Sequence, residues 1–254
     1  MNNIKDNNPQ YGNWVSTKFI YIPCVLGLIL LGFSFILPVL IIPAGFFLIT
    51  LIYFLYARNK FSSTGGDLQA KVRHLIFDYL DWDGRGEVLD IGCGNGPLAI
   101  ELARRHKDCK VVGIDYWGAA WDYSQKVCEH NADLAHVSDR ITFQKASAST
   151  LPFEEAHFDA VVSNFVFHEV KDTKDKRQLI KEALRTVKKG GAFSFQDLFL
   201  VESIYGDTDD LLEEIKSWGI ESVHFVKTND KEFIPQLLKL PFMLGEIGII
   251  YGRK

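Results

Sequence analysis

The stretch VLDIGCGNGPLAIEL, residues 88–102, decides the fold of this 254-residue chain. An apolar run ends in three glycines at alternate positions, Gly92, Gly94 and Gly96, and a helix-like sequence follows. Glycines at the point where a strand passes into a helix let the backbone approach a ligand closely, since side chains there would collide with it. The stretch therefore predicts a strand, a ligand-binding turn and a helix.

Strand-like and helix-like patterns alternate at short intervals through the rest of the chain. Strands are expected at 86–92, 110–115, 141–147, 158–165, 192–199, 221–226 and 245–252, and helices at 67–80, 97–106, 119–135, 175–191 and 207–219. This alternation predicts an α/β fold: a doubly wound, mostly parallel seven-stranded sheet, with helices on both faces and the ligand at the carboxyl ends of the strands. One of the last two strands can run antiparallel, because only residues 231–240 carry a helix signal between them.

The glycine spacing bears on the ligand. A dinucleotide site needs GxGxxG, whose third glycine lets helix and strand pack closely. Here the pattern is GxGxG, and Pro97 follows Gly96 directly. Asp115 ends the second predicted strand, where a carboxylate can accept hydrogen bonds from two ribose hydroxyls. The predicted ligand is thus a nucleoside with a free ribose and no essential pyrophosphate.

Four segments in order resemble the motifs of the class I S-adenosylmethionine-dependent methyltransferases. They are VLDIGCGNG, VVGIDYWG, ASTLPFEEAHFDAVVSNFVFHEV and EALRTVKKGGAFSFQDLF. The resemblance runs from about Asp67 to the end, and the apolar leader lies outside it. It implies that the chain is a methyltransferase, with S-adenosyl-L-methionine as cofactor and S-adenosyl-L-homocysteine as product.

The resemblance also implies roles for residues around the glycine turn. Gly92, Gly94 and Gly96 would line the methionine part of the cofactor. Asp90 would hold the turn, or the cofactor's amino group through water, and Asp115 would take the ribose hydroxyls.

Other implied cofactor contacts follow the next strands. Tyr116 or Trp117 would cover the adenine face. Many family members place an aspartate after the third strand to meet the adenine amine; here Ser147 stands at that position, followed by Ala148, and a hydroxyl accepts the bond without charge. Asn164, at the end of the fourth strand, would face the methyl-donor centre.

His168, followed by Glu169, is the candidate catalytic residue. A histidine after the fourth strand lies at the open edge of the sheet, where it can accept a proton at neutral pH. The alternative is that His168 stands at the start of a helix, where it packs against its neighbours or caps the helix. Gln196 and Asp197, after the fifth strand, are candidates on the substrate side.

Residues 19–57 carry no charge. A single helix of that length would rise about 58 Å, whereas a hydrocarbon core is about 30 Å thick. Pro38 and Pro43 lie near the midpoint, so a transmembrane helical hairpin is predicted. Lys18 before the run, with Arg58 and Lys60 after it, predicts that both ends and the catalytic domain lie on the cytoplasmic side. A re-entrant form and a soluble hairpin packed on the domain are the alternatives.

The predicted organisation is a polar tail (1–18), the hairpin (19–57), a linker (58–66) and the cofactor-binding domain (67–254). A net charge of -4 argues against a nucleic-acid partner, and four cysteines without a CxxC pair suggest neither a zinc site nor a disulfide framework. Membrane attachment favours a small acceptor that is apolar or membrane-associated, such as a lipid headgroup, a quinone precursor or a hydrophobic xenobiotic. The competing hypotheses are a membrane-anchored, non-catalytic binding or scaffold protein and, disfavoured by Pro97, a nicotinamide oxidoreductase.

Overall fold

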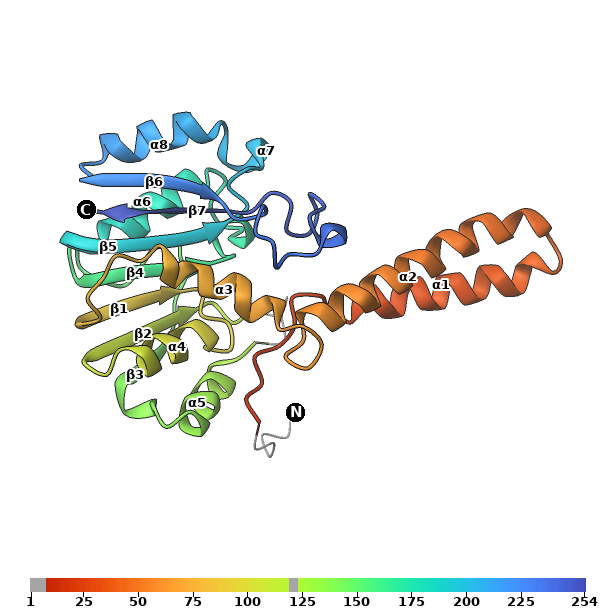
Figure 1. Cartoon of the computed structure of the whole chain (residues 1–254), viewed down its shortest axis with the longest axis horizontal. Helices are drawn as coiled ribbons and strands as arrows, with labels where there is room; N and C mark the ends of the chain where they lie inside the picture. Colours follow the sequence, from red (N-terminus) through yellow and green to blue (C-terminus); the bar gives the residue numbers. More distant parts are fainter. Residues whose placement is uncertain (1–7, 119–122) are drawn as a thin grey trace. The chain divides into compact units, whose positions relative to one another are not determined.

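A seven-stranded sheet forms the framework of the computed structural model, which describes residues 8–118 and 123–254 (Figure 1). The strand order is β3-β2-β1-β4-β5-β7-β6, and all pairs are parallel except those that β7 makes with β5 and β6. The sheet is therefore mixed. Its antiparallel strand is the last in the chain, as the sequence allowed for one of the last two strands. The strands are β1 Gly86–Ile91, β2 Cys109–Asp115, β3 Ile141–Lys145, β4 Phe158–Asn164, β5 Val187–Asp197, β6 Ser222–Lys227 and β7 Gly248–Arg253.

Helices cover both faces of the sheet, because successive residues of each strand point to opposite sides. Leu89 faces a core that includes Leu179 and Ile215, whereas Val88 faces one that includes Leu98 and Ile76. The helices from residue 68 onward are α3 Leu68–Asp78, α4 Pro97–Arg105, α5 Gln125–Leu134, α6 Arg177–Arg185, α7 Glu202–Tyr205 and α8 Thr208–Ser217, with short 3-10 turns η2 Ser138–Arg140, η3 Phe167–Glu169 and η4 Gln236–Leu238.

The helix expected over 175–191 is wrong at its end. α6 stops at Arg185, and β5 begins at Val187. Val187 pairs with Phe158, but the next pair along β4 is Ala160 with Ala192, so residues 188–191 bulge out of the ladder. Gly190, with φ of +77°, serves this bulge rather than a helix stop.

Two further helix predictions need correction. α5 begins at Gln125, where the Ser124 hydroxyl accepts a hydrogen bond from the amide of Val127, so residues 123–124 are not helical. The rest of the predicted start, residues 119–122, lies outside the described residues. Residues 231–240 form only the single turn η4.

The chain divides into two compact units. One joins the chain up to Gly12 with Arg73–Lys254, and the other is Asn13–Val72. Residues 8–12 of the predicted polar tail thus belong with the sheet.

The second unit contains two apolar helices, α1 Lys18–Ser34 and α2 Ile41–Phe61, joined through the 3-10 turn η1 Pro38–Leu40. Gly27 permits their close approach, because a Cβ there would lie 3.1 Å from Leu48 Cδ2. α2 continues through Phe61, so the first residues of the predicted linker are helical.

One stretch of the described chain, Pro38–Phe61, is long and apolar enough to cross a bilayer by length and composition, and an 18-residue window within it has a mean hydropathy of 2.3. α1 is apolar but shorter. Large apolar side chains on both helices and in the connection between them are exposed, with Phe33 on α1 at 57%, Phe35 in the connection at 89% and Ile42 on α2 at 72%.

Candidate cofactor site

The turn between β1 and α4 holds its three glycines in the left-handed region, with φ of +72° at Gly92, +59° at Gly94 and +82° at Gly96. A Cβ on Gly92 would lie 2.1 Å from Val166 Cγ2, and one on Gly96 would lie 3.1 Å from Phe143 Cζ. Backbone conformation and crowding within the protein therefore already require these two glycines. At Gly94 the nearest atom to a Cβ is 3.5 Å away, in ordinary contact.

Asp115 ties the end of β2 to this turn. Its Oδ2 accepts a hydrogen bond from the amide of Gly94 at 2.9 Å, and its Oδ1 accepts one from the amide of Trp117 at 2.7 Å. Burial raises the pKa of Asp115, although these amides oppose the rise. A carboxylate offers about four lone-pair directions, so the amides of Gly94, Trp117 and Tyr116 do not use the full capacity of Asp115 to accept a hydrogen bond from a ribose hydroxyl.

The two aromatic candidates after β2 lie in different settings. The indole Nε1 of Trp117 donates to the carbonyl of Gly94 at 2.8 Å, so this ring is engaged with the turn. Tyr116 is 65% exposed, and the Nζ of Lys145 lies 5.0 Å from its ring centroid. Tyr116 is therefore the better placed of the two to cover an adenine, and that role remains a prediction.

Ser147 and Ala148 follow β3 beside the end of β2, because the amide of Ala146 donates to the carbonyl of Asp115 at 3.0 Å. Ala148 is buried. Ser147 Oγ lies 3.0 Å from Asp172 Oδ2, and Ser149 Oγ lies 2.7 Å from the same atom. Hydrogen bonds from Ser149 and Ser147 lower the pKa of Asp172 despite some desolvation. The sequence did not predict this carboxylate next to Ser147.

Two buried oxygens at the ends of β1 and β4 have no hydrogen-bond partner within the described residues: Asp90 Oδ2 and Asn164 Oδ1. Burial raises the pKa of Asp90 to about 7. Buried acceptors without a donor are costly, and so they point to a ligand that brings one. The ammonium of a methionine moiety is such a donor, and the site therefore fits the cofactor that the sequence predicted.

His168, in η3, lies next to the end of β5. Its Nδ1 is 2.6 Å from Asp197 Oδ1, and its Nε2 is 3.6 Å from Glu169 Oε1. Burial by itself lowers the pKa of His168, but the charge and hydrogen bond of Asp197, together with the nearby carboxylate of Glu169, raise the pKa to about 10. The raised pKa favours the imidazolium form, in which both ring nitrogens donate hydrogen bonds. The expected role of His168 as a proton acceptor stays a prediction.

The two substrate-side candidates on β5 are both fully buried. Asp197 is occupied by His168 and by the amides of Val166 and Phe167, so it is not free to meet a substrate. Gln196 donates through Nε2 to Thr228 Oγ1 at 3.4 Å, and its Oε1 has no partner among the described residues.

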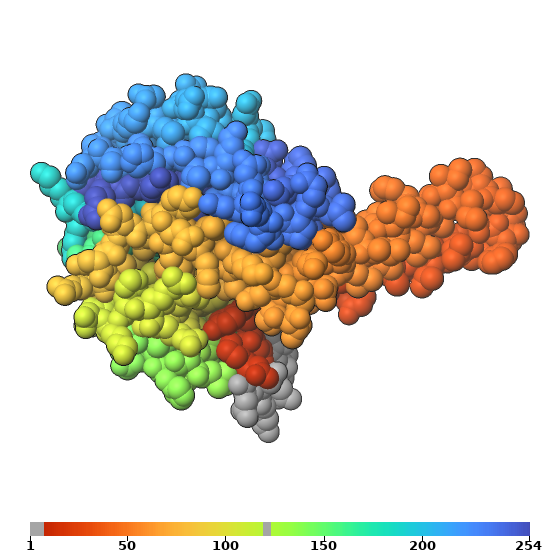
Figure 2. All heavy atoms as spheres, viewed as in Figure 1, coloured from red at the N-terminus to blue at the C-terminus, as the bar shows by residue number. Residues whose placement is uncertain are grey.

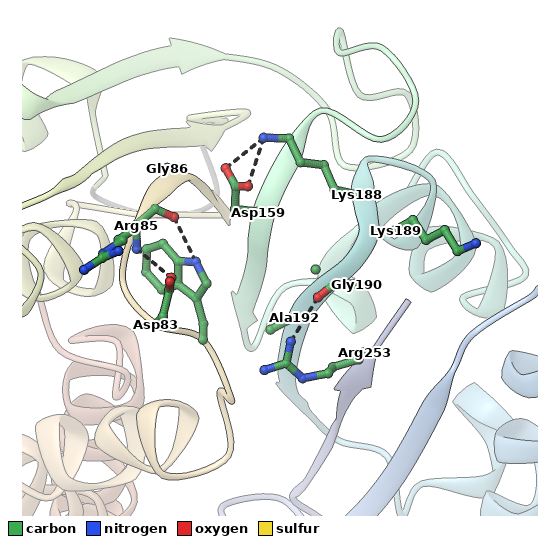
Figure 3. Close-up of a pocket in the computed structure, with 11 residues that line it drawn as sticks. Asp83, Arg85, Gly86, Asp159, Lys188, Lys189, Gly190, Ala192 and Arg253 are labelled. Atoms are coloured by element: carbon green, nitrogen blue, oxygen red, sulfur yellow. Dashed lines mark hydrogen bonds and ion pairs between the residues drawn. The ribbon is translucent and has the colours of Figure 1, made fainter.

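The structure thus brings the predicted residues to one edge of the sheet, where β3, β2, β1, β4 and β5 end side by side (Figure 1). A cavity of about 550 Å³ lies elsewhere, at the amino ends of β1 and β5 (Figure 3). There Lys188 Nζ lies 2.9 Å from Asp159, and Arg253 donates to the carbonyl of Gly190. These cavity groups bind one another, so this pocket is not the candidate site.

Residues 88–191 match a family described as a methyltransferase domain. Over 122 residues the chain is 36% identical to the 27-O-demethylrifamycin SV methyltransferase of Amycolatopsis mediterranei. The matched region is 47% of this chain and 41% of that protein. Over 152 residues it is 25% identical to the sterol 24-C-methyltransferase of Candida albicans, covering 60% of this chain and 38% of that protein. The chain spans less than half the length of either relative.

Solved structures share the fold. The geranyl diphosphate C-methyltransferase of Streptomyces coelicolor A3(2), in complex with S-adenosyl-L-homocysteine, aligns with a TM-score of 0.57 and 15% identity, covering 75% of this chain and 81% of that one. The [4+2]-cyclase SpnF aligns with a TM-score of 0.54 and 21% identity, covering 75% and 83%. The fold is methyltransferase-like, and one neighbour with this fold is a cyclase, so the fold alone does not define the reaction. The family match together with the site geometry supports S-adenosylmethionine as the cofactor.

Proposed function

We propose that this chain transfers a methyl group from S-adenosylmethionine to a small, apolar acceptor at a membrane. The observation that carries the proposal is the hydrogen bond between Asp115 and Gly94, at 2.9 Å, at the same end of the strands as the Asp90 and Asn164 oxygens that have no partner in the described part of the chain. Asp115 suits the hydroxyls of a ribose, and the oxygens of Asp90 and Asn164 suit an ammonium. The match of residues 88–191 to methyltransferase domains supports the reaction class.

When bound, the cofactor supplies a methyl group that is already activated on a positively charged sulfur. The protein therefore has to bind, align the acceptor and exclude water. In the proposed site Asp115 holds the ribose, the glycine turn lies against the methionine part, and Asn164 accepts from the ammonium. Ser147, backed by Asp172, accepts from the adenine amine.

The proposed role of His168 is to orient the acceptor as a hydrogen-bond donor. Asp197 fixes Nδ1, which leaves Nε2 facing Glu169 at 3.6 Å, a distance longer than a good hydrogen bond. Nε2 can then donate to an electron-rich oxygen of an acceptor. An acceptor whose reacting oxygen ionises easily suits this arrangement, because a cation beside it stabilises the anion.

Membrane attachment is proposed from the unit Asn13–Val72. Its exposed side chains include Phe35 and Ile42, and apolar surface of this kind is unfavourable in water. The 17 residues of α1 and the 21 of α2 would span about 25 and 31 Å. These lengths are close to the thickness of the hydrocarbon core of a bilayer. Lys18, Arg58 and Lys60 at the ends favour a hairpin with both ends, and the catalytic domain, on the cytoplasmic side.

An apolar acceptor follows from that attachment, because an enzyme fixed at a bilayer meets membrane-dissolved molecules at high effective concentration. Two relatives are named for acceptors that are single organic molecules, 27-O-demethylrifamycin SV and a sterol. These names support the acceptor class and do not identify the molecule.

The test is incubation of the full chain with S-adenosylmethionine carrying a labelled methyl group, and with separate lipid and aqueous extracts of host cells. Label in a lipid-extract product that depends on wild-type protein, and falls with Asp115→Ala, is expected. Label confined to water-soluble products would contradict the apolar acceptor. Cofactor binding without any labelled product would favour the non-catalytic binding protein.

A further inference from the structure

The segment before the apolar hairpin lies against the glycine turn. Gln10 takes part through its backbone alone: its amide donates to Asn131 Oδ1 at 2.8 Å, and its carbonyl accepts from Asn95 Nδ2 at 2.9 Å and from Asn131 Nδ2 at 3.3 Å. In Figure 2 the red surface that includes residues 8–12 lies against the yellow-green and green surface that includes α4 and α5. The segment is thus fixed to two side chains of the sheet unit.

Both asparagines are buried, Asn131 fully and Asn95 at 4% exposure. Asn131, in α5, also donates from Nδ2 to the carbonyl of Asn95 at 2.9 Å, and Asn95 Oδ1 accepts from the amide of Ser124, the cap residue of α5. Each polar atom of the two side-chain amides is therefore used. Networks that are buried and fully satisfied hold a single arrangement.

Asn95 stands between Gly94 and Gly96, so this network fixes the centre of the turn. The amide of Gly94 is the one that Asp115 accepts at 2.9 Å. Tyr123 links the same parts by packing: a Cβ on Gly12 would lie 2.9 Å from its ring, and a Cβ on Gly94 would lie 3.5 Å from it. A shift of the N-terminal segment would therefore move the backbone that meets the cofactor.

We propose that residues 8–12 form part of the cofactor-binding apparatus, with Asn95 and Asn131 as positioning residues that hold the glycine turn for S-adenosylmethionine. The inference rests on the proposed function and deepens it. Because binding free energies are reciprocal, a bound cofactor must in turn hold the segment more firmly. Only residues 13–17 separate Gly12 from α1, so the cofactor site is stabilised by a segment attached directly to the hairpin.

The test is a matched pair of variants in the full chain, titrated with S-adenosylhomocysteine by calorimetry. Gln10→Pro removes the amide that donates to Asn131, whereas Gln10→Ala keeps every backbone contact. We expect Gln10→Pro to raise the Kd about fivefold or more, since an unpaired buried partner is left behind, and Gln10→Ala to stay within about twofold. Asn131→Ala, which leaves several partners unpaired, should raise the Kd about tenfold or more.

Amide hydrogen exchange gives a second readout, because S-adenosylhomocysteine should slow exchange at Gln10 in the wild-type chain. Gln10→Pro with an unchanged Kd, even with a lower Tm, would show a merely structural segment and overturn the inference. Unchanged exchange at Gln10 on binding would also overturn it. If the wild-type chain does not bind S-adenosylhomocysteine at all, the proposed function fails as well, and the wild-type titration separates that outcome from the others.

Discussion

His168 Nδ1 lies 2.6 Å from Asp197 Oδ1, and the Asp197 carboxylate is fully buried. Backbone amides of Val166, Phe167 and Leu198 donate to the same carboxylate. A buried anion with this many donors holds the turn after β4 against the end of β5, and the imidazolium balances its charge. The His168–Asp197 pair should therefore stabilise the fold, in addition to the role proposed for His168 in orienting the acceptor.

His168→Gln should lower the free energy of unfolding by about 2 kcal/mol at pH 6, as a lost hydrogen bond to a charged group does. The folded pKa, about 10, lies above the ordinary value of 6.5. The stabilisation is thus complete below pH 6.5 and is lost as pH rises through about 10. Urea unfolding from pH 6 to 10.5 measures it.

The matched control is His74→Gln. His74 Nε2 lies 3.0 Å from Glu101 in a pair whose histidine side chain is 42% exposed, and such pairs contribute little. If the loss of unfolding free energy in His168→Gln stayed constant up to pH 10.5, His168 and Asp197 would not form a charged pair.

Three glycine-to-alanine variants separate backbone strain from crowding. Gly190, on the β5 bulge, has φ of +77°, and no atom of residues 8–118 or 123–254 outside its immediate neighbours lies within 4 Å of its Cβ position, so Gly190→Ala should cost about 1–2 kcal/mol and leave the cofactor Kd unchanged. Gly94→Ala should show a similar cost but weaken cofactor binding. Gly92→Ala adds the collision with Val166 and should be the least stable. Thermal unfolding and calorimetry measure both effects, and equal Kd values for all three would refute the turn as the site.

Cofactor affinity should depend on pH through Asp90. Burial raises the pKa of this carboxyl to about 7, so it is half protonated at that pH without ligand. A cationic ammonium nearby favours the carboxylate, and so the Kd for S-adenosylhomocysteine should fall as pH rises through 7. The slope is at most about tenfold per pH unit. Asp90→Asn should flatten the profile, and a wild-type curve that is flat from pH 5.5 to 8.5 would exclude the contact.

The membrane proposal is tested by fractionation of the host cell. The full chain should stay in the membrane pellet after an alkaline wash. Ile29→Arg combined with Ile49→Arg, at positions 49% and 70% exposed, should move protein to the soluble fraction, because each arginine costs about 2.5–3.5 kcal/mol at the centre of a spanning helix. Glu213→Arg on α8 is the control and should remain in the pellet. Retention of the double variant in the pellet would contradict a hairpin held by its apolar surface.

Local patterns in the sequence predicted the strands, the glycine turn and Asp115, because each depends on the periodicity or conformation of neighbouring residues. The start of β5 could not be predicted in this way. Its residues VKKGG resemble the end of a helix, and only pairing with β4 makes them a strand with a bulge.

Several functional groups depend on contacts between distant residues. Asp172 is 25 positions from Ser147, and Asn131 is 36 positions from Asn95. The protonation of His168 depends on Asp197, 29 positions away. No spacing in a single sequence indicates these pairs. The contacts of Asp172 and Asp197 changed the interpretation of Ser147 and His168, whereas the Asn95–Asn131 pair was not singled out from the sequence at all.

The glycine turn and Asp115 are proposed to bind adenosine that carries a charged sulfur. Calorimetry of the full chain with S-adenosylmethionine and S-adenosylhomocysteine measures this binding, with NAD and the Asp115→Ala variant as controls. We expect binding of both sulfur compounds, a Kd at least about tenfold weaker in Asp115→Ala, and no binding of NAD. Binding of NAD by a chain that gives no heat with either sulfur compound would contradict this proposal.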